Sequence, residues 1–205
     1  MPQFQGALPW VLTIVIGYLF GSISFSLVIG KIFEHKDVRE YGSGNAGTTN
    51  ALRVLGKKAA FFVLLGDILK CLVSVLIGGW LLPGIGAWIG GLCCMVGHVF
   101  PVFFKFRGGK AVAAGIAMMV FVCPPAGFSA LAVFAVIFAI TRIVSVSSLS
   151  AFLVFPLFIW LFTKEPLYVI IAAVMFVFVL ILHRANIGRL IRGEEKKISF
   201  KSSKK

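Results

Sequence analysis

Residues 59–82 read AAFFVLLGDILKCLVSVLIGGWLL, and this stretch decides the fold class. A helix rises about 1.5 Å per residue, so the stretch is long enough to cross a hydrocarbon core roughly 30 Å thick. Asp67 and Lys70 lie within it, three residues apart on one helix face. Charges at this depth are costly unless they are paired or face an aqueous cavity. We therefore predict a transmembrane helix carrying either a structural ion pair or support for a functional site.

Composition extends this prediction to the whole chain. Of the 205 residues, 60% are hydrophobic and 13% are charged, whereas soluble domains have about 45–50% apolar and about 25% charged residues. In a membrane protein, the net charge of +13 indicates orientation and anionic lipid rather than nucleic acid. The four cysteines lie in apolar segments without metal-ligand spacing, which predicts packing roles and neither a metal site nor a disulfide.

Other apolar segments lie at residues 7–29, 85–99, 111–122, 127–140, 151–162 and 166–182. With seven spans and an external N-terminus, all of the 20 lysines and arginines except Lys70 and Lys164 are cytoplasmic, as the positive-inside rule requires. We predict an all-α integral membrane protein with about seven transmembrane helices and a cytoplasmic C-terminus. Residues 1–193 would form one domain and residues 194–205 a basic, disordered tail. In a five-span alternative, the segments at residues 111–122 and 127–140 form one hairpin that enters the membrane from the inside.

Glycine pairs within these segments predict close helix packing. Gly17 and Gly21 lie four residues apart, as do Gly86 and Gly90. Small residues at this spacing let two helix backbones approach each other.

The first polar stretch on the predicted cytoplasmic side is Gly42-Ser43-Gly44-Asn45-Ala46-Gly47-Thr48-Thr49-Asn50. Its glycines allow positive φ angles and a close backbone approach to a ligand. Its N–H groups and short polar side chains suit a phosphate, and Arg53 follows one helical turn later. A flexible linker is the alternative interpretation, which two further polar stretches disfavour.

The second polar stretch joins Gly97-His98-Val99-Phe100-Pro101 to Phe106-Arg107-Gly108-Gly109-Lys110. Its end is similar to the end of a Walker A loop, but Ala111 stands where the magnesium ligand would be. What remains is a glycine pair that lets a lysine and backbone amides reach an anion. An interfacial anchor of aromatic and basic residues is the alternative.

The third polar stretch is His183-Arg184-Ala185-Asn186-Ile187-Gly188-Arg189-Leu190. His183, Asn186 and Arg189 are spaced by three, so we expect them to line one helix face. A basic stop-transfer end would explain the arginines but not His183 and Asn186. A nearby group of serines, at positions 145, 147, 148 and 150, is typical of a helix N-cap and a polar helix face.

The three polar stretches resemble motifs of the bacterial acyl-phosphate-dependent glycerol-3-phosphate acyltransferases. Two shorter segments match as well: Asp67-Ile68-Leu69-Lys70 and Val144-Ser145-Val146-Ser147-Ser148. The match in order and spacing covers nearly the whole chain apart from the tail. Such enzymes move a fatty acyl group from acyl phosphate to the 1-hydroxyl of sn-glycerol 3-phosphate. The products are lysophosphatidic acid and phosphate, in the first step of phospholipid synthesis. Ala111 and Ala114 depart from the glycine and threonine usual in that family.

The resemblance implies a site facing the cytoplasm in the bacterial inner membrane. We expect no cofactor and no metal, because no His/Cys/Asp/Glu cluster has ligand spacing and the magnesium ligand of a Walker A loop is missing. The implied partners are glycerol 3-phosphate, long-chain acyl phosphate, membrane lipid and the soluble enzyme that makes acyl phosphate. Neither coenzyme A nor acyl carrier protein would be the direct donor. A transporter of a small organic phosphate is the alternative function, although no inverted repeat is found. A non-catalytic module that binds anionic lipid would not explain His183 with Asn186.

Acyl transfer between these substrates requires two phosphates to be held side by side. The candidate catalytic residues are Ser43, Arg53, Lys110, His183 and Asn186. The candidate binding residues are Gly44, Asn45, Thr49, Asn50, His98, Gly108, Gly109, Ser145 and Ser148. Arg53 and Lys110 would supply positive charge to the phosphates. His183 and Asn186 would hold glycerol 3-phosphate, and the two serines would contact acyl phosphate.

Two general bases are compatible with these residues. The His-x4-Asp pattern of many acyltransferases is absent. Either His183 removes the proton from the attacking hydroxyl, or a substrate phosphate does so while the protein positions the reactants and stabilises charge. The second is favoured because no carboxylate near His183 in the sequence is evident to orient its ring.

Overall fold

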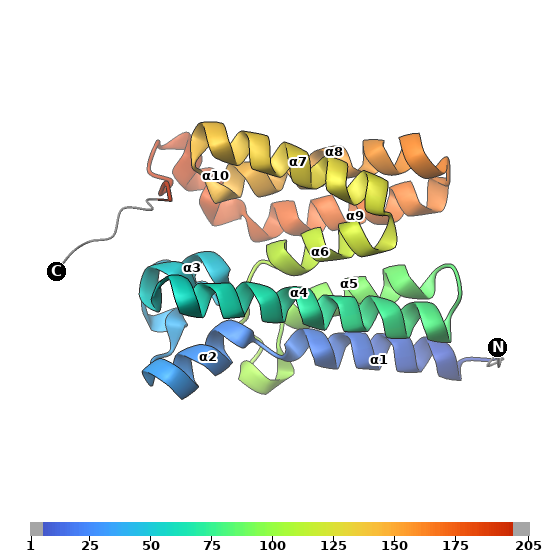
Figure 1. Ribbon diagram of the computed structural model, residues 1–205, viewed down its shortest axis with the longest axis horizontal. Coiled ribbons are helices and arrows are strands. Elements are labelled where there is room, and N and C mark those ends of the chain that lie inside the picture. Colours follow the sequence, from blue (N-terminus) through green and yellow to red (C-terminus); the bar gives the residue numbers. More distant parts are fainter. Residues whose placement is uncertain (1–5, 199–205) are drawn as a thin grey trace. The chain divides into compact units, whose positions relative to one another are not determined.

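The computed structural model describes residues 6–198, and this range contains helices and no strands (Figure 1). The all-α prediction is therefore confirmed for the described residues. The chain divides into two compact units, Met1–Pro124 and Pro125–Lys205. The domain of residues 1–193 and the tail of residues 194–205 stay predictions, and residues 199–205 lie outside the described residues.

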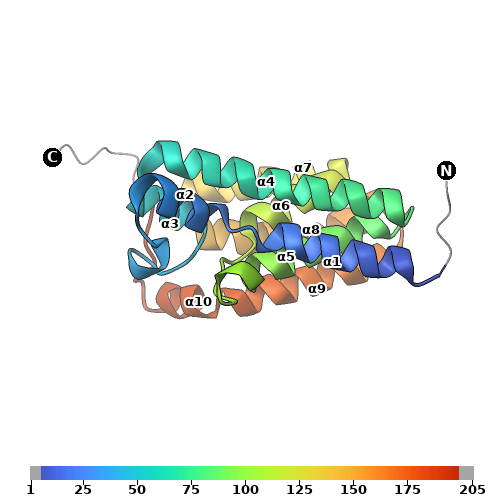
Figure 2. The same ribbon diagram turned by 90° about the horizontal axis from the view of Figure 1, so that it is seen from below.

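The first unit is a group of closely packed helices. It contains α1 (Leu8–Ser22), α2 (Phe25–Glu34), α3 (Thr48–Val54), α4 (Gly56–Leu81), α5 (Gly86–Val99) and α6 (Val112–Val122), with short 3-10 helices at Val38–Glu40 and Val102–Phe104. Helices α1, α4 and α5 pack on one another, and α6 packs on α4 and α5 (Figure 2). A Cβ on Gly21 would overlap the Cys94 carbonyl, and a Cβ on Gly90 would overlap the Ser74 carbonyl. The close packing predicted from the glycine pairs is confirmed.

The second unit contains long apolar helices and a short polar one. They are α7 (Pro124–Thr141), α8 (Val144–Thr163), α9 (Pro166–Leu182) and α10 (Arg184–Ile191). Pro166 lies in the first turn of α9, where its missing N–H costs nothing, and α9 packs along α8. At His183 the chain bends by 62° between α9 and α10. This bend sets the geometry of the third polar stretch.

Five stretches of the described chain are long and apolar enough to cross a membrane: residues 8–34, α4, residues 86–104, α7 and α8. The pair of α9 and α10, bent between the two helices, gives a sixth if it is counted as one span. Helix α6 is apolar but has only 11 residues, and a helix of that length extends about 16 Å. Each predicted apolar segment is thus largely helical, whereas seven complete spans and the external N-terminus stay predictions.

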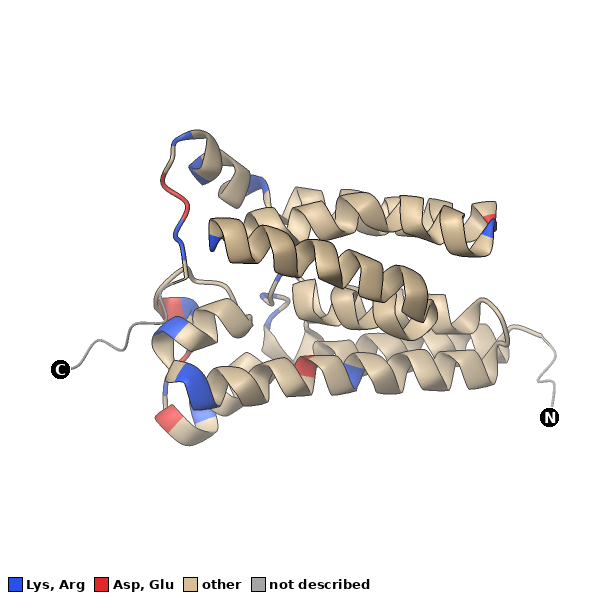
Figure 3. Cartoon of the chain, turned by 45° about the horizontal axis from the view of Figure 1, so that its top comes forward, with Lys and Arg blue, Asp and Glu red and all other residues tan. Residues whose placement is uncertain are grey.

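Charged residues are sparse along the long helices (Figure 3). After Lys57 and Lys58 in its first turn, α4 contains one acidic and one basic residue, Asp67 and Lys70. Their side chains are almost fully buried, and Lys70 Nζ lies 2.8 Å from Asp67 Oδ1. The predicted ion pair is therefore present, and it compensates part of the cost of burying both charges.

Candidate active site

The first polar stretch is folded around the side chain of Asn50. Asn50 Oδ1 accepts a hydrogen bond from Ser43 N at 2.8 Å. Its Nδ2 donates to the carbonyls of Val38 at 2.7 Å and Tyr41 at 3.1 Å. Gly42 has a φ of 66°, and a Cβ there would overlap the Asn50 amide. The stretch is therefore a shaped loop and not a flexible linker, and Asn50 is placed to shape it.

The loop presents its polar groups at the surface of the first unit. Ser43 and Gly44 are exposed, and Asn45 and Thr49 are partly exposed. Gly44 has a φ of 72°, a conformation that glycine adopts without steric cost. Arg53 is exposed in the last turn of α3. The predicted donors to a phosphate are thus accessible on one loop and the helix that follows it.

The second polar stretch folds back onto the end of α5. Gly108 N donates to the Val99 carbonyl at 3.0 Å, and Gly109 N donates to the His98 carbonyl at 3.1 Å. A Cβ on Gly109 would overlap the His98 ring and lie 2.6 Å from the carbonyl oxygen of Ala46. The glycine pair therefore allows this loop to contact both α5 and the first polar stretch. The two stretches meet within the first unit.

The two positions that depart from the resembled family, Ala111 and Ala114, are both buried just after the glycine pair. Lys110 is half-buried. Ala111 is fully buried and has a left-handed φ of 54°, a conformation in which the family's usual glycine is more easily accommodated. Ala114 is fully buried in α6, where a hydroxyl group would need a hydrogen-bond partner. Phe103 and Phe106 are exposed, so the stretch also has the aromatic surface expected of an interfacial anchor.

A buried charged network lies beside the glycine pair. Lys70 Nζ is 2.8 Å from Asp67 Oδ1, 2.8 Å from the Ile23 carbonyl and 2.9 Å from His98 Nδ1. An ammonium group has three N–H donors and no lone pair. Because Nζ has no lone pair, His98 Nδ1 is the acceptor in this contact and the proton of the neutral ring is on Nε2. The ion pair of α4 thus orients the histidine against which Gly109 packs.

The third polar stretch does not line one continuous helix face. The expectation is wrong because the helix breaks at His183, which ends α9 and precedes α10. His183 Nδ1 lies 2.8 Å from the Val179 carbonyl, and its Nε2 lies 3.4 Å from Ser148 Oγ. A carbonyl can only accept, so Nδ1 carries the proton. Nε2 of the neutral ring is therefore the nitrogen with a lone pair.

Asn186 and Arg189 lie together on α10 and converge on Glu195, a residue that the sequence analysis missed. Glu195 accepts hydrogen bonds from Asn186 Nδ2 at 2.6 Å, Arg189 Nε at 2.6 Å and Ser145 Oγ at 2.8 Å. Burial disfavours ionisation of this carboxyl, but these donors hold its pKa below the ordinary value. The missed signal was a pair of acidic residues, Glu194 and Glu195, shortly after Asn186 in an otherwise basic segment.

The serines of α8 are not N-caps. Ile143 caps the helix and its side chain makes no capping bond, so that expectation was wrong. Ser147 Oγ donates to the Ile143 carbonyl, and Ser148 Oγ to the Val144 carbonyl, both at 2.9 Å. Hydroxyl bonds to the preceding turn satisfy buried serines within a helix. Within the second unit, Ser145, Ser148, His183 and Asn186 thus belong to one polar cluster.

Comparison with known proteins agrees with these arrangements. A family model described as glycerol-3-phosphate acyltransferase matches residues 11–193. A glycerol-3-phosphate acyltransferase 2 of Bacillus anthracis is 42% identical over 92% of this chain and 98% of its own length. The glycerol-3-phosphate acyltransferase of Bacillus subtilis strain 168 is 38% identical over 92% of this chain and 97% of its own length.

Two solved structures have the same fold. Both are of PlsY (YgiH), described as an integral membrane glycerol 3-phosphate acyltransferase. The glycerol 3-phosphate form aligns with a TM-score of 0.85 at 35% identity, over 92% of this chain and 95% of that one. The lysophosphatidic acid form aligns with a TM-score of 0.82 at 34% identity, with the same coverage. The chain is therefore a multi-pass membrane protein that belongs to the glycerol-3-phosphate acyltransferase family.

Proposed function

We propose that this protein transfers a fatty acyl group from acyl phosphate to the 1-hydroxyl of sn-glycerol 3-phosphate, releasing lysophosphatidic acid and phosphate. Family membership supports acylation of glycerol 3-phosphate. The observation that carries the choice of acyl phosphate is the contact of Gly109 with Ala46 of the first polar loop. This arrangement offers short donors and flanking cations suited to a small phosphate.

The first unit would bind a phosphate group. Ser43, Asn45 and Thr49 are accessible donors, and the backbone at Gly44 can approach closely. Arg53 and Lys110 would add charge-assisted hydrogen bonds, which are about twice as strong as neutral ones. Their charge would stabilise the phosphate as it leaves the acyl group.

The second unit would bind glycerol 3-phosphate through His183 and Asn186. The hydroxyl of Ser145 is already donated to Glu195, so we assign Ser145 to orienting that carboxylate. Ser148 stays the candidate for acyl phosphate, and contact with a phosphate would require its hydroxyl to turn away from the Val144 carbonyl.

Two groups are candidates to accept the proton of the attacking hydroxyl: His183 and a substrate phosphate. His183 Nε2 has a lone pair when Nδ1 donates to Val179. However, a carbonyl stabilises the resulting imidazolium less than the carboxylate of a catalytic triad would. We therefore keep a substrate phosphate as the base. Replacing glycerol 3-phosphate by its phosphorothioate, which has a lower pKa, should shift the acidic limb of the kcat/KM profile to lower pH. An unshifted limb that disappears in His183→Gln would assign the base to His183.

The orientation of the site is also a proposal. We propose that both polar clusters face the cytoplasm of a bacterial inner membrane. In a cysteine-free background, a cysteine in place of exposed Lys57 should react with an impermeant reagent only after the inner face is opened. A cysteine in place of Lys164 should react from outside. The reverse labelling pattern would overturn the cytoplasmic site.

A test of the phosphate site is Lys110→Ala, with Lys105→Ala as the matched control in the same loop. Loss of a charge-assisted contact costs about 1.5–3 kcal/mol, so we expect kcat/KM to fall at least about tenfold in Lys110→Ala and to change little in the control. Full activity of Lys110→Ala would remove this lysine from the site. Uptake of glycerol 3-phosphate into liposomes without product formation would favour a transporter instead.

A further inference from the structure

The turn just before the glycine pair has an unfavourable backbone. Lys105 and Phe106 are consecutive residues with left-handed φ angles of 59° and 55°. Residues other than glycine rarely adopt this conformation, because Cβ approaches the carbonyl oxygen too closely. Both side chains are exposed, so their own packing does not explain the turn. Other contacts must therefore hold it.

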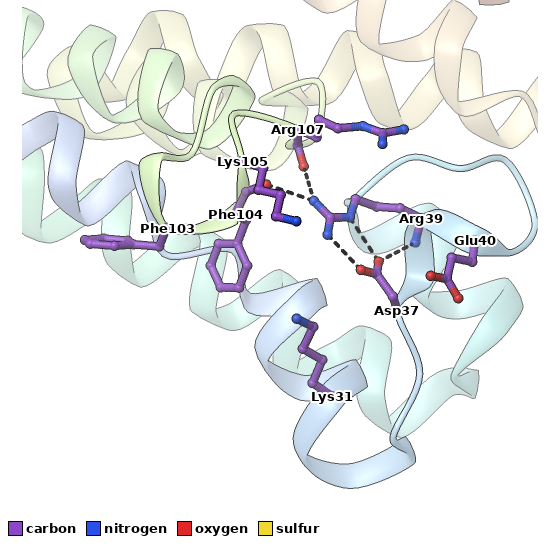
Figure 4. A pocket seen from close by; sticks show the side chains of 8 residues that line it. All are labelled: Lys31, Asp37, Arg39, Glu40, Phe103, Phe104, Lys105 and Arg107. Atoms are coloured by element: carbon purple, nitrogen blue, oxygen red, sulfur yellow. Dashed lines mark hydrogen bonds and ion pairs between the residues drawn. The ribbon is translucent and has the colours of Figure 1, made fainter.

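Arg39 supplies such contacts from the first polar region. Its Nη1 donates to the Phe104 carbonyl at 2.9 Å and to the Arg107 carbonyl at 3.1 Å. These two carbonyls flank the two left-handed residues on either side (Figure 4). One guanidinium group thus spans the turn, while the backbone of Gly108 and Gly109 is bonded to the end of α5.

Asp37 orients this arginine. Its Oδ1 accepts from Arg39 Nε at 3.0 Å, and its Oδ2 accepts from Arg39 Nη2 at 2.7 Å. Two parallel bonds between a carboxylate and a guanidinium fix the plane of the arginine. This hydrogen bonding also holds the pKa of Asp37 below its ordinary value. A lysine could not make the paired bonds and contact both carbonyls in this geometry.

We infer that Arg39, oriented by Asp37, is a positioning residue that holds the turn at residues 104–107 and thereby places Gly108, Gly109 and Lys110 against the first polar loop. Arg39 acts through the backbone and not by contacting substrate. The inference rests on the proposed role of Lys110 in acyl transfer, because misplacing that lysine is what would slow the reaction.

A direct anion site is the competing explanation. Arg39 lines a pocket of about 380 Å³ together with Lys31, Asp37, Glu40, Phe103, Phe104, Lys105 and Arg107. If Arg39 acted there by its charge, Arg39→Lys would keep most of the activity. If it acts by holding two carbonyls, the lysine variant should fail. Arg107→Ala is a suitable control, because the structure uses the carbonyl of Arg107 and not its side chain.

The test measures kcat and KM for lysophosphatidic acid formation. In Arg39→Lys we expect kcat to fall at least about tenfold, since an error of about 1 Å in positioning can cost up to about 100-fold. The kcat of Asp37→Asn should fall less, and the kcat of Arg107→Ala should remain near that of the wild type. Lys105→Gly with Phe106→Gly should restore activity about threefold or more in the Arg39→Lys background, because glycine adopts the left-handed conformation freely. Full activity of Arg39→Lys, or no rescue by glycine, would overturn the inference.

A second readout does not depend on activity. Trypsin cleaves after Lys105 and Arg107, and an unclamped turn should be cut faster. We expect cleavage to accelerate about tenfold in Arg39→Lys and to a smaller extent in Asp37→Asn. If Arg39→Lys fails to fold, Asp37→Asn provides the test in its place. Unchanged cleavage would overturn the clamp. Faster cleavage in a protein that makes no lysophosphatidic acid would keep the clamp and reject the proposed function.

Discussion

The glycine loop of the first unit and the bend at His183 in the second unit are built in opposite ways. The loop is held mainly through its backbone: carbonyls of residues 98, 99, 104 and 107 accept hydrogen bonds, and two glycines allow close contact. The bend is followed by side chains that converge on one carboxylate, Glu195. The position of the loop therefore depends on glycines, which have no side chain to prevent close backbone contact. The arrangement around the bend depends on the single charge of Glu195.

The largest effect should come from adding a methyl group to the loop. In Gly108→Ala the new Cβ would overlap the His98 carbonyl, a backbone atom that cannot move aside easily. We expect kcat/KM to fall by about 100-fold or more, because the loop that carries Lys110 must shift. Gly79→Ala is the control, since its Cβ would have ordinary contacts only. Near-normal activity of Gly108→Ala would show that close contact is not required.

The next effect should come from the buried network beside the loop. Asp67→Asn leaves the ammonium of Lys70 buried without its counter-charge, and breaking such a pair costs about 3–5 kcal/mol. We expect a large fall in the unfolding temperature in detergent. Asp67→Asn combined with Lys70→Met should be less destabilising than Asp67→Asn alone. Equal unfolding temperatures for the wild type and Asp67→Asn would contradict the role of this pair.

A smaller effect should follow from Glu195→Gln, which keeps the shape but removes the charge that orients Asn186. We expect a loss of several-fold in kcat/KM, mainly through a higher KM for glycerol 3-phosphate, because hydrogen bonds to a charged group are worth about 1.5–3 kcal/mol. Glu194→Gln is the matched control, since its partner Arg192 is exposed. A Glu195→Gln enzyme with unchanged KM would separate Glu195 from substrate binding.

The pH dependence of this cluster has a definite sign. The folded pKa of Glu195 lies below its ordinary value of 4.5. Its stabilising contribution is therefore fully present above the ordinary pKa and is lost as the pH falls through the folded pKa. The difference in unfolding temperature between the wild type and Glu195→Gln should stay constant down to about pH 5 and shrink at lower pH. A difference that disappears already near neutral pH would contradict the assignment.

The smallest effect should be that of Ala111→Gly. Glycine relieves the left-handed φ of this position, but it also removes a buried methyl group worth about 0.8 kcal/mol. We expect stability to change by less than about 1 kcal/mol, whereas Ala111→Val should be clearly destabilising. The unfolding temperatures of the two variants give their relative stabilities. A valine variant as stable as the glycine variant would argue against the left-handed backbone.

Sequence reasoning succeeded where local pattern determines structure. Long apolar segments predicted the helices, and glycine spacing predicted close packing of α1 and α5, but not that α4 would be a packing partner. The ion pair in α4 followed from helical spacing. The loop at Gly42–Asn50 was recognised by its composition, although the inward role of Asn50 needed the folded backbone.

What the sequence did not predict depends on contacts between distant residues. The break at His183 has no proline or glycine beside it to mark it. Glu195 was assigned to a basic tail, and only folding places it against Ser145, 50 positions earlier. Arg39 was counted only among the cytoplasmic lysines and arginines, whereas the structure pairs it with carbonyls 65 and 68 residues away. Long-range polar contacts of this kind leave no periodic signal in one sequence.

The most direct measurement is product formation by the purified protein with each donor in turn. Acyl phosphate and glycerol 3-phosphate should give lysophosphatidic acid and phosphate, and the rate should be unchanged in excess EDTA. Acyl-CoA as the only donor should give no product. Efficient use of acyl-CoA would contradict the acyl phosphate assignment, and complete loss of activity in EDTA would contradict a reaction supported by the side chains alone.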